Sequence, residues 1–353
     1  MKITFLTPHI KISGGIKLIL GYADRLAKKG HAVTVVCPQS TFARMRIEGV
    51  PIFFPHRLLM NLVKYKPKWI QVAAKIKYVP SYDERYIPDA DIVIATAWQT
   101  SEYVNNYPLE KGKKFHLFMQ YERLWDDGCD DVDTFSYKLA LKKIVISSCL
   151  QKFLKRSFNV DSLLIIAPID HEIFYPVRDG YNKDKRICML YQPYRWKGVE
   201  DGIRAYEIAK VKHPEIQLVM FGPRKEMEVR NYEYHYNLTN HELRELYNSC
   251  DIFLCPSWRE GFGLPSAEAM ACGCALITTD HGGCRDYAYH EKTALVSPPK
   301  NPEELADNLV RILEDEKLFR CVAENGYKHI KKFAWDKAVD KMEKVFLEEL
   351  QKE

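Results

Sequence analysis

Short apolar runs alternate with longer amphipathic stretches along this chain of 353 residues, and no other feature of the sequence limits the fold more. The first run, 3–7, precedes a stretch at 15–29 in which apolar residues recur every three or four positions, as on one buried face of a helix. Gly30 is a typical helix stop, and a second apolar run follows at 32–37. This order predicts an α/β protein with parallel sheets.

The alternation occurs twice, before and after a polar stretch at 175–184 that has the composition of a linker. Before the linker, further strands are predicted at 91–96, 115–119, 143–147 and 163–166. After it, strands are predicted at 187–191, 216–221, 251–255, 275–279 and 293–297, with helices at 199–212, 241–248 and 265–271 and a helical tail from 302. We therefore expect two Rossmann-like, doubly wound domains, 1–175 and 185–335, that face a cleft where ligands bind.

Composition excludes several other classes of protein. No run of eighteen apolar residues occurs, so no transmembrane span is expected, and the opening strand is too short for a signal peptide. The ten cysteines fit no disulfide or zinc pattern, which favours reduced thiols and a cytoplasmic location. With 52 basic and 47 acidic residues, the net charge of +5 does not predict a nucleic-acid partner.

The run from Glu260 to Gly273, EGFGLPSAEAMACG, is the most informative segment for function. Its two early glycines allow a tight loop, and Pro265 suits the first turn of a helix. We expect the amides of Leu264, Ser266 and Ala267 to point outward and to form an anion site for a phosphate. Glu260 and Glu268 would accept hydrogen bonds from hydroxyl groups on either side. Hydroxyls, phosphates and hydroxyls in this order describe a nucleotide sugar. In the simpler interpretation, the glycines only make a turn and Glu268 is solvated.

This run resembles the E-x7-E signature of the retaining glycosyltransferases of GT-B fold, in particular glycosyltransferase family 4. Other short motifs agree in order and spacing along nearly the whole chain: Gly14-Gly15, 30–35 (GHAVTV), 170–176 (DHEIFYP), Lys197-Gly198, 243–257 (LRELYNSCDIFLCPS), Gly282-Gly283 with Asp286, and 333–335 (FAW). The resemblance implies two Rossmann-like domains, with a C-terminal helix, 336–353, that crosses back to the first domain. It also implies a first domain on the acceptor side and a second that binds the nucleotide sugar.

The resemblance assigns roles to individual residues. Glu260 would bind the donor sugar, and the backbone of Gly261, Phe262, Gly263 and Leu264 would approach the sugar and the diphosphate. Glu268 would hold the ribose, and Lys197 with Arg195 would neutralise the leaving diphosphate. Gly14 and Gly15 would approach the phosphates from the first domain, and Gly222 is a further candidate for substrate binding. The donor would be a UDP-sugar, or next a GDP-sugar, with no cofactor and no metal.

The sequence departs from the family pattern at three places. Gln192 stands where the family has its arginine, so Arg195 is the available substitute. Of the usual N-G-V-D before the hinge, only Asp170 is kept. The usual histidine after the strand at 115–119 is replaced by Gln120-Tyr121-Glu122, a run similar to that of members that build surface polysaccharides. Gln120 would then bond the donor sugar and Glu122 would orient or deprotonate an acceptor hydroxyl. The alternative is that Glu122 is a surface carboxylate beside Arg123.

The segment 51–82 contains six lysines and arginines, no acidic residue and many bulky apolar residues. This composition suits a peripheral contact with an anionic membrane at its inner face, or a lipid-linked acceptor. The alternative is a pair of helices packed on the sheet with their lysines in water.

The sequence thus predicts a glycosyltransferase that moves a sugar from a nucleotide sugar to a glycan or lipid-linked acceptor in surface polysaccharide or glycoconjugate synthesis, with retention of anomeric configuration. A nucleotide-sugar epimerase or a phosphorylase of the same architecture is an alternative. A non-catalytic module that binds nucleotides or glycans is another.

Overall fold

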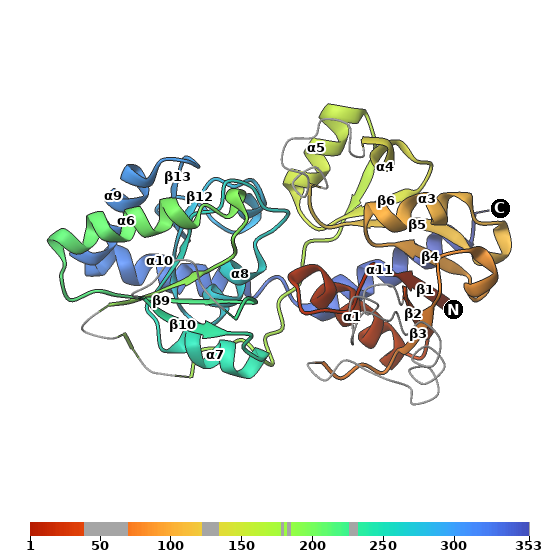
Figure 1. Cartoon of the computed structure of the whole chain (residues 1–353), viewed down its shortest axis with the longest axis horizontal. Helices are drawn as coiled ribbons and strands as arrows, with labels where there is room; N and C mark the ends of the chain where they lie inside the picture. The colour runs from red at the N-terminus through yellow and green to blue at the C-terminus, as the bar shows by residue number, and fades with distance from the viewer. Residues whose placement is uncertain (39–69, 122–133, 178–179, 182–184, 226–231, 353) are drawn as a thin grey trace, which may run out of the picture. The chain divides into compact units, whose positions relative to one another are not determined.

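The computed structural model describes residues 1–38, 70–121, 134–177, 180–181, 185–225 and 232–352, which form two compact units. Unit 1 consists of Met1–Ile146, Leu150–Ile166 and Asp336–Glu353. Unit 2 consists of Ser147–Cys149 and Ala167–Trp335. Each unit has its own parallel sheet (Figure 1). The predicted fold class, two Rossmann-like units of the GT-B type, is confirmed.

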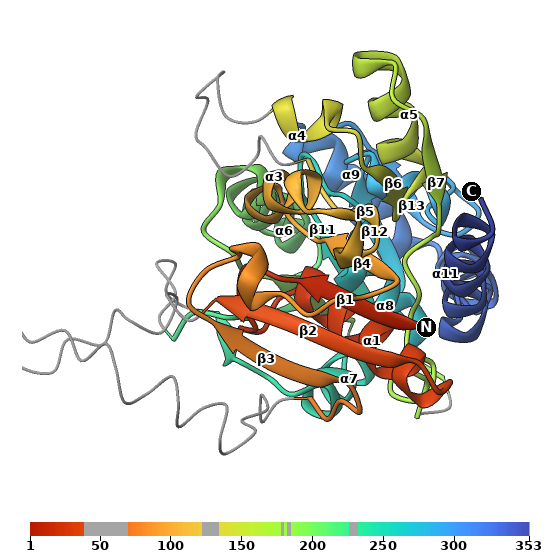
Figure 2. The ribbon, with the colours of Figure 1, turned by 90° about the vertical axis from the view of Figure 1, so that its right-hand side faces the viewer.

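Unit 1 is built on a seven-stranded sheet in the order β3-β2-β1-β4-β5-β6-β7, in which all neighbouring strands are parallel (Figure 2). The strands are β1 (Lys2–Leu6), β2 (Ala32–Pro38), β3 (Lys75–Val79), β4 (Ile92–Ala95), β5 (Lys113–Phe118), β6 (Lys142–Val145) and β7 (Ser162–Leu164). The helices are α1 (Gly14–Lys28), α3 (Trp98–Asn106), α4 (Thr134–Lys138), α5 (Ser148–Phe158) and α11 (Trp335–Leu350). The central strands are buried on both faces, as in other parallel sheets.

Unit 2 is built on a six-stranded parallel sheet in the order β10-β9-β8-β11-β12-β13. The strands are β8 (Arg186–Leu190), β9 (Gln217–Gly222), β10 (Glu233–Tyr236), β11 (Ile252–Cys255), β12 (Ala275–Thr279) and β13 (Leu295–Ser297). The helices are α6 (Val199–Lys212), α7 (Asn240–Asn248), α8 (Leu264–Ala271), α9 (Pro302–Glu314) and α10 (Glu316–Ile330). Helices α6 and α9 pack side by side over a continuous apolar core (Figure 1).

The edge strands β3 and β10 were not among the predicted elements. For 51–82 the sequence offers a helix pair as one alternative, and this is wrong for the part that contains β3, whereas the membrane contact stays a prediction. In Lys75-Ile76-Lys77-Tyr78-Val79 the apolar residues are buried, and the two lysines alternate with them. Such lysines discourage an edge strand from pairing with another chain. Residues 51–69, with most of the basic side chains, lie outside the described residues.

Helix α11 is part of unit 1, as predicted for a C-terminal helix that returns to the first domain. The buried ring of Phe346 meets Phe115 of β5 edge-on at 5.1 Å between centroids. Glu343 of the same helix accepts hydrogen bonds from His31, at 2.6 Å, and from Lys29. The contact between Phe346 and Phe115 and the hydrogen bonds of Glu343 thus hold α11 against the rest of unit 1.

The chain passes from unit 1 to unit 2 after Ile166, upstream of the polar stretch at 175–184. Ile169 forms a bridge with Ala334, and Phe174 packs near Tyr247 within unit 2. These contacts explain why residues 167–177 group with the second sheet.

Candidate active site

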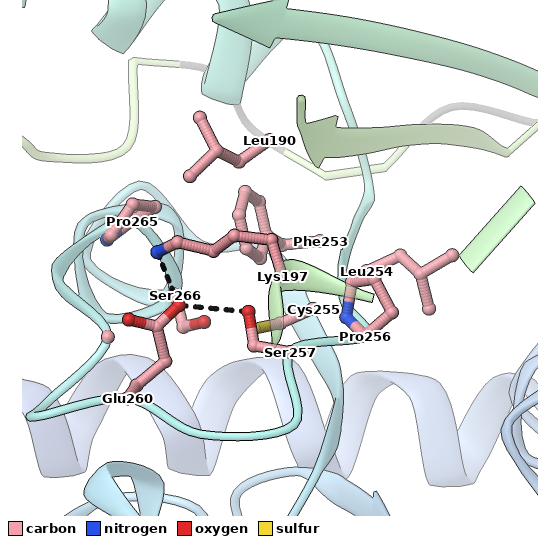
Figure 3. Close-up of a pocket in the computed structure, with 11 residues that line it drawn as sticks. Leu190, Lys197, Phe253, Leu254, Cys255, Pro256, Ser257, Glu260, Pro265 and Ser266 are labelled. Carbon is pink, nitrogen blue, oxygen red and sulfur yellow. Dashed lines mark hydrogen bonds and ion pairs between the residues drawn. The ribbon is translucent and has the colours of Figure 1, made fainter. Parts of the chain in front are cut away.

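A pocket lies at the point in unit 2 where the strand order reverses. Strands β8 and β11 are neighbours, but the chain leaves β8 toward β9 on one side and leaves β11 toward β12 on the other. Ligands of open parallel sheets bind beyond the carboxyl ends of the strands at such a point. The pocket is lined by Leu190, Lys197, Phe253, Leu254, Cys255, Pro256, Ser257, Glu260, Gly263, Pro265 and Ser266 (Figure 3).

Lys197 reaches this pocket because the loop after β8 lies directly against the loop after β11. A short 3-10 turn, Arg195–Lys197, ends at Gly198, which has φ 61°. A Cβ at this position would lie 2.2 Å from the carbonyl oxygen of Pro256. Only glycine therefore permits this approach, and the approach places the Lys197 side chain among the pocket residues.

Glu260 is the acidic group of the pocket. Its Oε1 accepts hydrogen bonds from Nζ of Lys197 at 2.7 Å and from Oγ of Ser257 at 2.9 Å (Figure 3). The Glu260 side chain is 17% exposed and that of Lys197 is 15% exposed. Burial favours the neutral acid, but Lys197, His281 and the two hydrogen bonds outweigh it and hold the pKa of Glu260 below its ordinary value. The pocket therefore holds an ionised carboxylate beside a cation.

The start of α8 borders the pocket and differs in one respect from the prediction. The amides of Ser266 and Ala267 do not point outward as free donors, because both donate to the carbonyl of Gly263, at 3.1 and 3.3 Å. Gly263, with φ 92°, turns this carbonyl toward the first helical turn. Of the three predicted amides, only that of Leu264 has no acceptor among the described residues. The anion site expected here is thus smaller than predicted.

The loop 260–263 is fixed by the segment after β12. The amide of Glu260 donates to the carbonyl of His281 at 3.1 Å, and Tyr287 Oη donates to the carbonyls of Phe262 and Gly263. The ring of Phe262 is buried against Tyr287, so only the backbone at 262 is available to a ligand. Gly261 is also buried, with its backbone against Gly283.

Three further predicted residues of unit 2 do not line the pocket. Glu268 is buried on α8, and its Oε2 accepts a hydrogen bond of 3.4 Å from Tyr247. Arg195 is exposed, and its guanidinium lies 5.6 Å from the centre of the Trp258 ring. Gly222 ends β9 beside the carbonyl of Tyr191. Their predicted roles stay predictions.

The remaining predicted residues belong to unit 1. Gly14 and Gly15 begin α1, whose cap is Ser13; Oγ of Ser13 accepts a hydrogen bond from the amide of Ile16 at 3.3 Å. Gln120 follows β5 and is half-buried. Glu122 lies outside the described residues.

Sequence reasoning missed Ser257, Cys255 and His281. Ser257 lies two residues after the strand β11 that precedes the acidic loop, and this position is the signal that could have identified it. Cys255 ends β11 and lines the pocket, and His281, after β12, lowers the pKa of Glu260; neither is marked by a local motif. Among the described residues, no cluster of three or more His, Cys, Asp or Glu side chains is arranged to hold a metal ion.

A family comparison agrees with this geometry. Residues 176–329 match the model of the family described as "Glycosyl transferases group 1". This range contains the whole pocket. The resemblance seen in the sequence is therefore confirmed over this part of the second unit.

Among curated relatives, the N,N'-diacetylbacillosaminyl-diphospho-undecaprenol alpha-1,3-N-acetylgalactosaminyltransferase of Campylobacter jejuni is 33% identical over 41% of this chain and 40% of its own length. An uncharacterized glycosyltransferase of Methanocaldococcus jannaschii is 26% identical over 57% of this chain and 58% of its own length. The chain thus spans about half the length of these relatives.

Similarity to solved structures extends over nearly the whole chain. Anabaena HepE in complex with UDP-glucose has a TM-score of 0.75 at 14% identity and covers 99% of this chain and 100% of its own. Sucrose-phosphate synthase of Thermosynechococcus elongatus has a TM-score of 0.74 at 18% identity, with 98% of both chains covered. At these identities the similarity establishes the fold.

Proposed function

We propose that this protein is a glycosyltransferase that moves a sugar from a nucleotide-sugar donor to a glycan or lipid-linked acceptor. The observation that supports this most is the Lys197–Glu260 pair in the pocket at the switch point of unit 2. A cation beside an ionised carboxylate suits a ligand that combines an anionic diphosphate with hydroxyl donors.

In this proposal Glu260 accepts hydrogen bonds from hydroxyls of the donor sugar, and Lys197 binds the diphosphate. Negative charge develops on the leaving phosphate during transfer, so a fixed cation in a partly dry pocket lowers the barrier. The paired state, at 2.7 Å, holds both side chains in place before the donor arrives. No metal is needed for this role, since Lys197 supplies the positive charge.

Other predicted residues complete the proposal. Glu268 would bind the ribose hydroxyls. The guanidinium of Arg195 would move away from the Trp258 ring and bind the diphosphate together with Lys197. In unit 1, Gly14 and Gly15 would approach the diphosphate. Gln120 would bond the donor sugar and Glu122 an acceptor hydroxyl. These assignments extend the family resemblance to positions with matching motifs.

The acceptor and the stereochemistry follow from the same resemblance. The name of the Campylobacter relative describes a sugar linked to diphospho-undecaprenol, which supports a lipid-linked acceptor and a role in surface polysaccharide or glycoconjugate synthesis. Retention of anomeric configuration is the outcome that the family signature favours. Proton NMR of the first product, before mutarotation, distinguishes retention from inversion.

The proposal is tested by nucleotide release from UDP- and GDP-sugars, with and without acceptor. We expect release by the native protein and a loss of about 100- to 1,000-fold in kcat for Glu260→Gln. Glu324→Gln, at an exposed position of α10, is the matched control and keeps the native rate. Native kcat in a folded Glu260→Gln protein contradicts the assignment.

The same experiment separates the alternatives. An epimerase changes the sugar while the nucleotide stays attached, and a phosphorylase releases sugar phosphate only when inorganic phosphate is added. A binding module shows a nucleotide-dependent rise in Tm without turnover. UDP is the first probe because of the family resemblance.

A further inference from the structure

Trp258 lies against the turn that carries Lys197, and the proposed transfer reaction gives the tryptophan itself no role. Trp258 is partly buried and follows Ser257 in the loop after β11. Its backbone amide donates to the carbonyl of Trp196 at 2.7 Å. Because Trp196 directly precedes Lys197, this hydrogen bond ties the loop after β11 to the middle of the turn Arg195–Lys197.

The indole of Trp258 lies at the end of the same turn. A Cβ on Gly198 would lie 3.2 Å from Nε1 of the indole, in addition to its close approach to the Pro256 carbonyl. The backbone of Gly198 therefore meets both groups of the loop after β11. Since Gly198 directly follows Lys197, the indole limits the movement of the backbone from which the lysine side chain extends.

Asp201 fixes the orientation of the indole. Nε1 of Trp258 donates to Oδ2 of Asp201 at 2.6 Å. Asp201 lies in the first turn of α6, which begins directly after Gly198. Hydrogen bonds to carboxylate groups are among the stronger ones in proteins. The indole thus connects the loop after β11 to the start of the helix that follows the Lys197 turn.

Two cations also lie over the indole ring, and one of them begins the turn. Nζ of Lys300 is 4.5 Å from the ring centre, and the guanidinium carbon of Arg195 is 5.6 Å from the Trp258 ring. Cations within about 6 Å of an aromatic ring are attracted to its face. Trp258 therefore contacts the turn at its first residue, at its middle and at the glycine that ends it.

We propose that Trp258, fixed by Asp201, is a positioning residue that holds this turn so that Lys197 stays beside Glu260 and meets the diphosphate of the donor. Misplacement of a catalytic group by about 1 Å can slow a reaction by about 100-fold, so a residue that restrains the turn affects transfer without touching the substrate. The statement about the diphosphate rests on the proposed function. The statement about the Lys197–Glu260 pair, which is 2.7 Å long, does not.

The first test is a double-mutant cycle that compares falls in Tm. We expect Trp258→Leu to weaken the Lys197–Glu260 pair, so its fall in Tm should be smaller when Lys197→Met has already removed that pair. Phe319→Leu, in a buried ring of α10 outside the pocket, is the control and should give the same fall in both backgrounds. Equal falls for Trp258→Leu, or for Trp258→Phe if the first variant does not fold, would show that the indole only packs and would overturn the proposal.

The second test uses two neighbouring acidic residues in the first turn of α6. Asp201→Ala and Glu200→Ala each remove one acidic side chain from the same helix start, but Asp201 is the one that accepts the hydrogen bond of Trp258. We expect Asp201→Ala to shift the NMR signal of the Trp258 indole N–H, identified by its loss in Trp258→Phe. Glu200→Ala should leave it in place, and Asp201→Asn, which keeps an acceptor oxygen, should largely restore it. The same signal in Asp201→Ala and native protein would overturn the role of Asp201.

The third test measures the effect on the donor. We expect Trp258→Leu and Asp201→Ala to bind UDP or GDP more weakly and to lose about 10-fold in kcat, with KM for the acceptor unchanged. Glu200→Ala and Asp201→Asn should stay near the native values. Native kcat in folded Trp258→Leu would overturn the statement about the diphosphate. If the native protein binds neither nucleotide and releases none from its sugars, the proposed function fails, whereas the cycle and the NMR signal still decide whether Trp258 positions Lys197.

Discussion

Gly198 shows at the scale of one residue why a short motif was informative. In the sequence, Lys197-Gly198 attracts attention through its lysine, but the structure gives the glycine an equal part, because the backbone of 198 passes against the Pro256 carbonyl. Lys197 and Gly198 together therefore join the loop after β8 to the loop after β11. The resemblance assigns Lys197 and Glu260 to one site, and in the structure their side chains form a hydrogen bond of 2.7 Å.

We predict that Gly198→Ala lowers both stability and nucleotide binding. Its Cβ would lie 2.2 Å from a backbone oxygen, in a left-handed conformation that alanine adopts at a cost of about 1 kcal/mol before any clash. The control is Gly180→Ala, at φ 83° with no atom within 4 Å of the added Cβ. Thermal unfolding should show a larger fall in Tm for Gly198→Ala. Equal falls would mean that backbone conformation alone matters.

Lys197 allows a prediction that does not depend on the function. In Lys197→Met the buried Glu260 loses its cation, so the pKa of Glu260 rises and the unfolding free energy near pH 7 falls by roughly 3 kcal/mol. The sign follows from linkage: the depressed pKa in the native protein stabilises it above pH 4.5, and this advantage disappears as pH falls and Glu260 becomes protonated.

The measurement for Lys197 is the difference in Tm between native protein and variant from pH 7.5 to pH 4. We expect the difference to shrink steadily on acidification. Lys328→Met, which removes an exposed lysine 3.7 Å from Glu324 on α10, should give almost no difference at any pH. A constant gap for Lys197→Met would show that Glu260 is not the titrating partner.

At the scale of elements, the central strands could be predicted, as could the edge strands β7 and β13, but the edge strands β3 and β10 could not. Strands such as β11 and β12 are continuous apolar runs, because both faces of a parallel sheet are covered. Strands β3 and β10 are short and mix charged or polar residues with aromatic ones, so their sequences give no such run. The free amides at α8 were predicted wrongly for a related reason: the left-handed φ of Gly263 decides where its carbonyl points, and no residue pattern shows this.

Helix α11 provides a prediction at this scale. We expect Phe346→Ala to destabilise unit 1 by about 3–5 kcal/mol, because a fully buried ring packed on Phe115 is removed. The neighbouring Leu347 is 46% exposed, so Leu347→Ala on the same helix should cost less than about 0.5 kcal/mol. Hydrogen exchange of the amides in β5, followed by mass spectrometry, measures both variants. Similar protection in the two variants would show that α11 is not anchored through its apolar face.

At the scale of the whole molecule, the sequence says least about which surface of the protein contacts the proposed acceptor. The pocket is built within unit 2 from loops that the family motif marks, whereas the basic segment 51–82 has no motif and belongs to the other unit. No helix among the described residues is long and apolar enough to cross a membrane.

The structure narrows which lysines of this segment are candidates for such a contact. Nζ of Lys77 donates to the carbonyl of Tyr86 at 2.6 Å, and burial together with Lys75 and Lys111 lowers the pKa of Lys77. Lys77 is therefore occupied within unit 1. The candidates that stay are Arg57, Lys64, Lys66 and Lys68, outside the described residues, and Lys75 on β3.

We predict that the protein sediments with vesicles of anionic lipid and dissociates as salt rises, because each basic residue near such a surface contributes about 1 kcal/mol within a Debye length of about 10 Å. Changing Lys64, Lys66 and Lys68 to Glu should abolish binding and slow transfer to a lipid-linked acceptor but not to a short soluble one. Changing the exposed Lys337, Lys341 and Lys344 of α11 to Glu alters net charge equally and should preserve binding. Equal losses in both triple variants would mean that total charge, and not this segment, attracts the membrane.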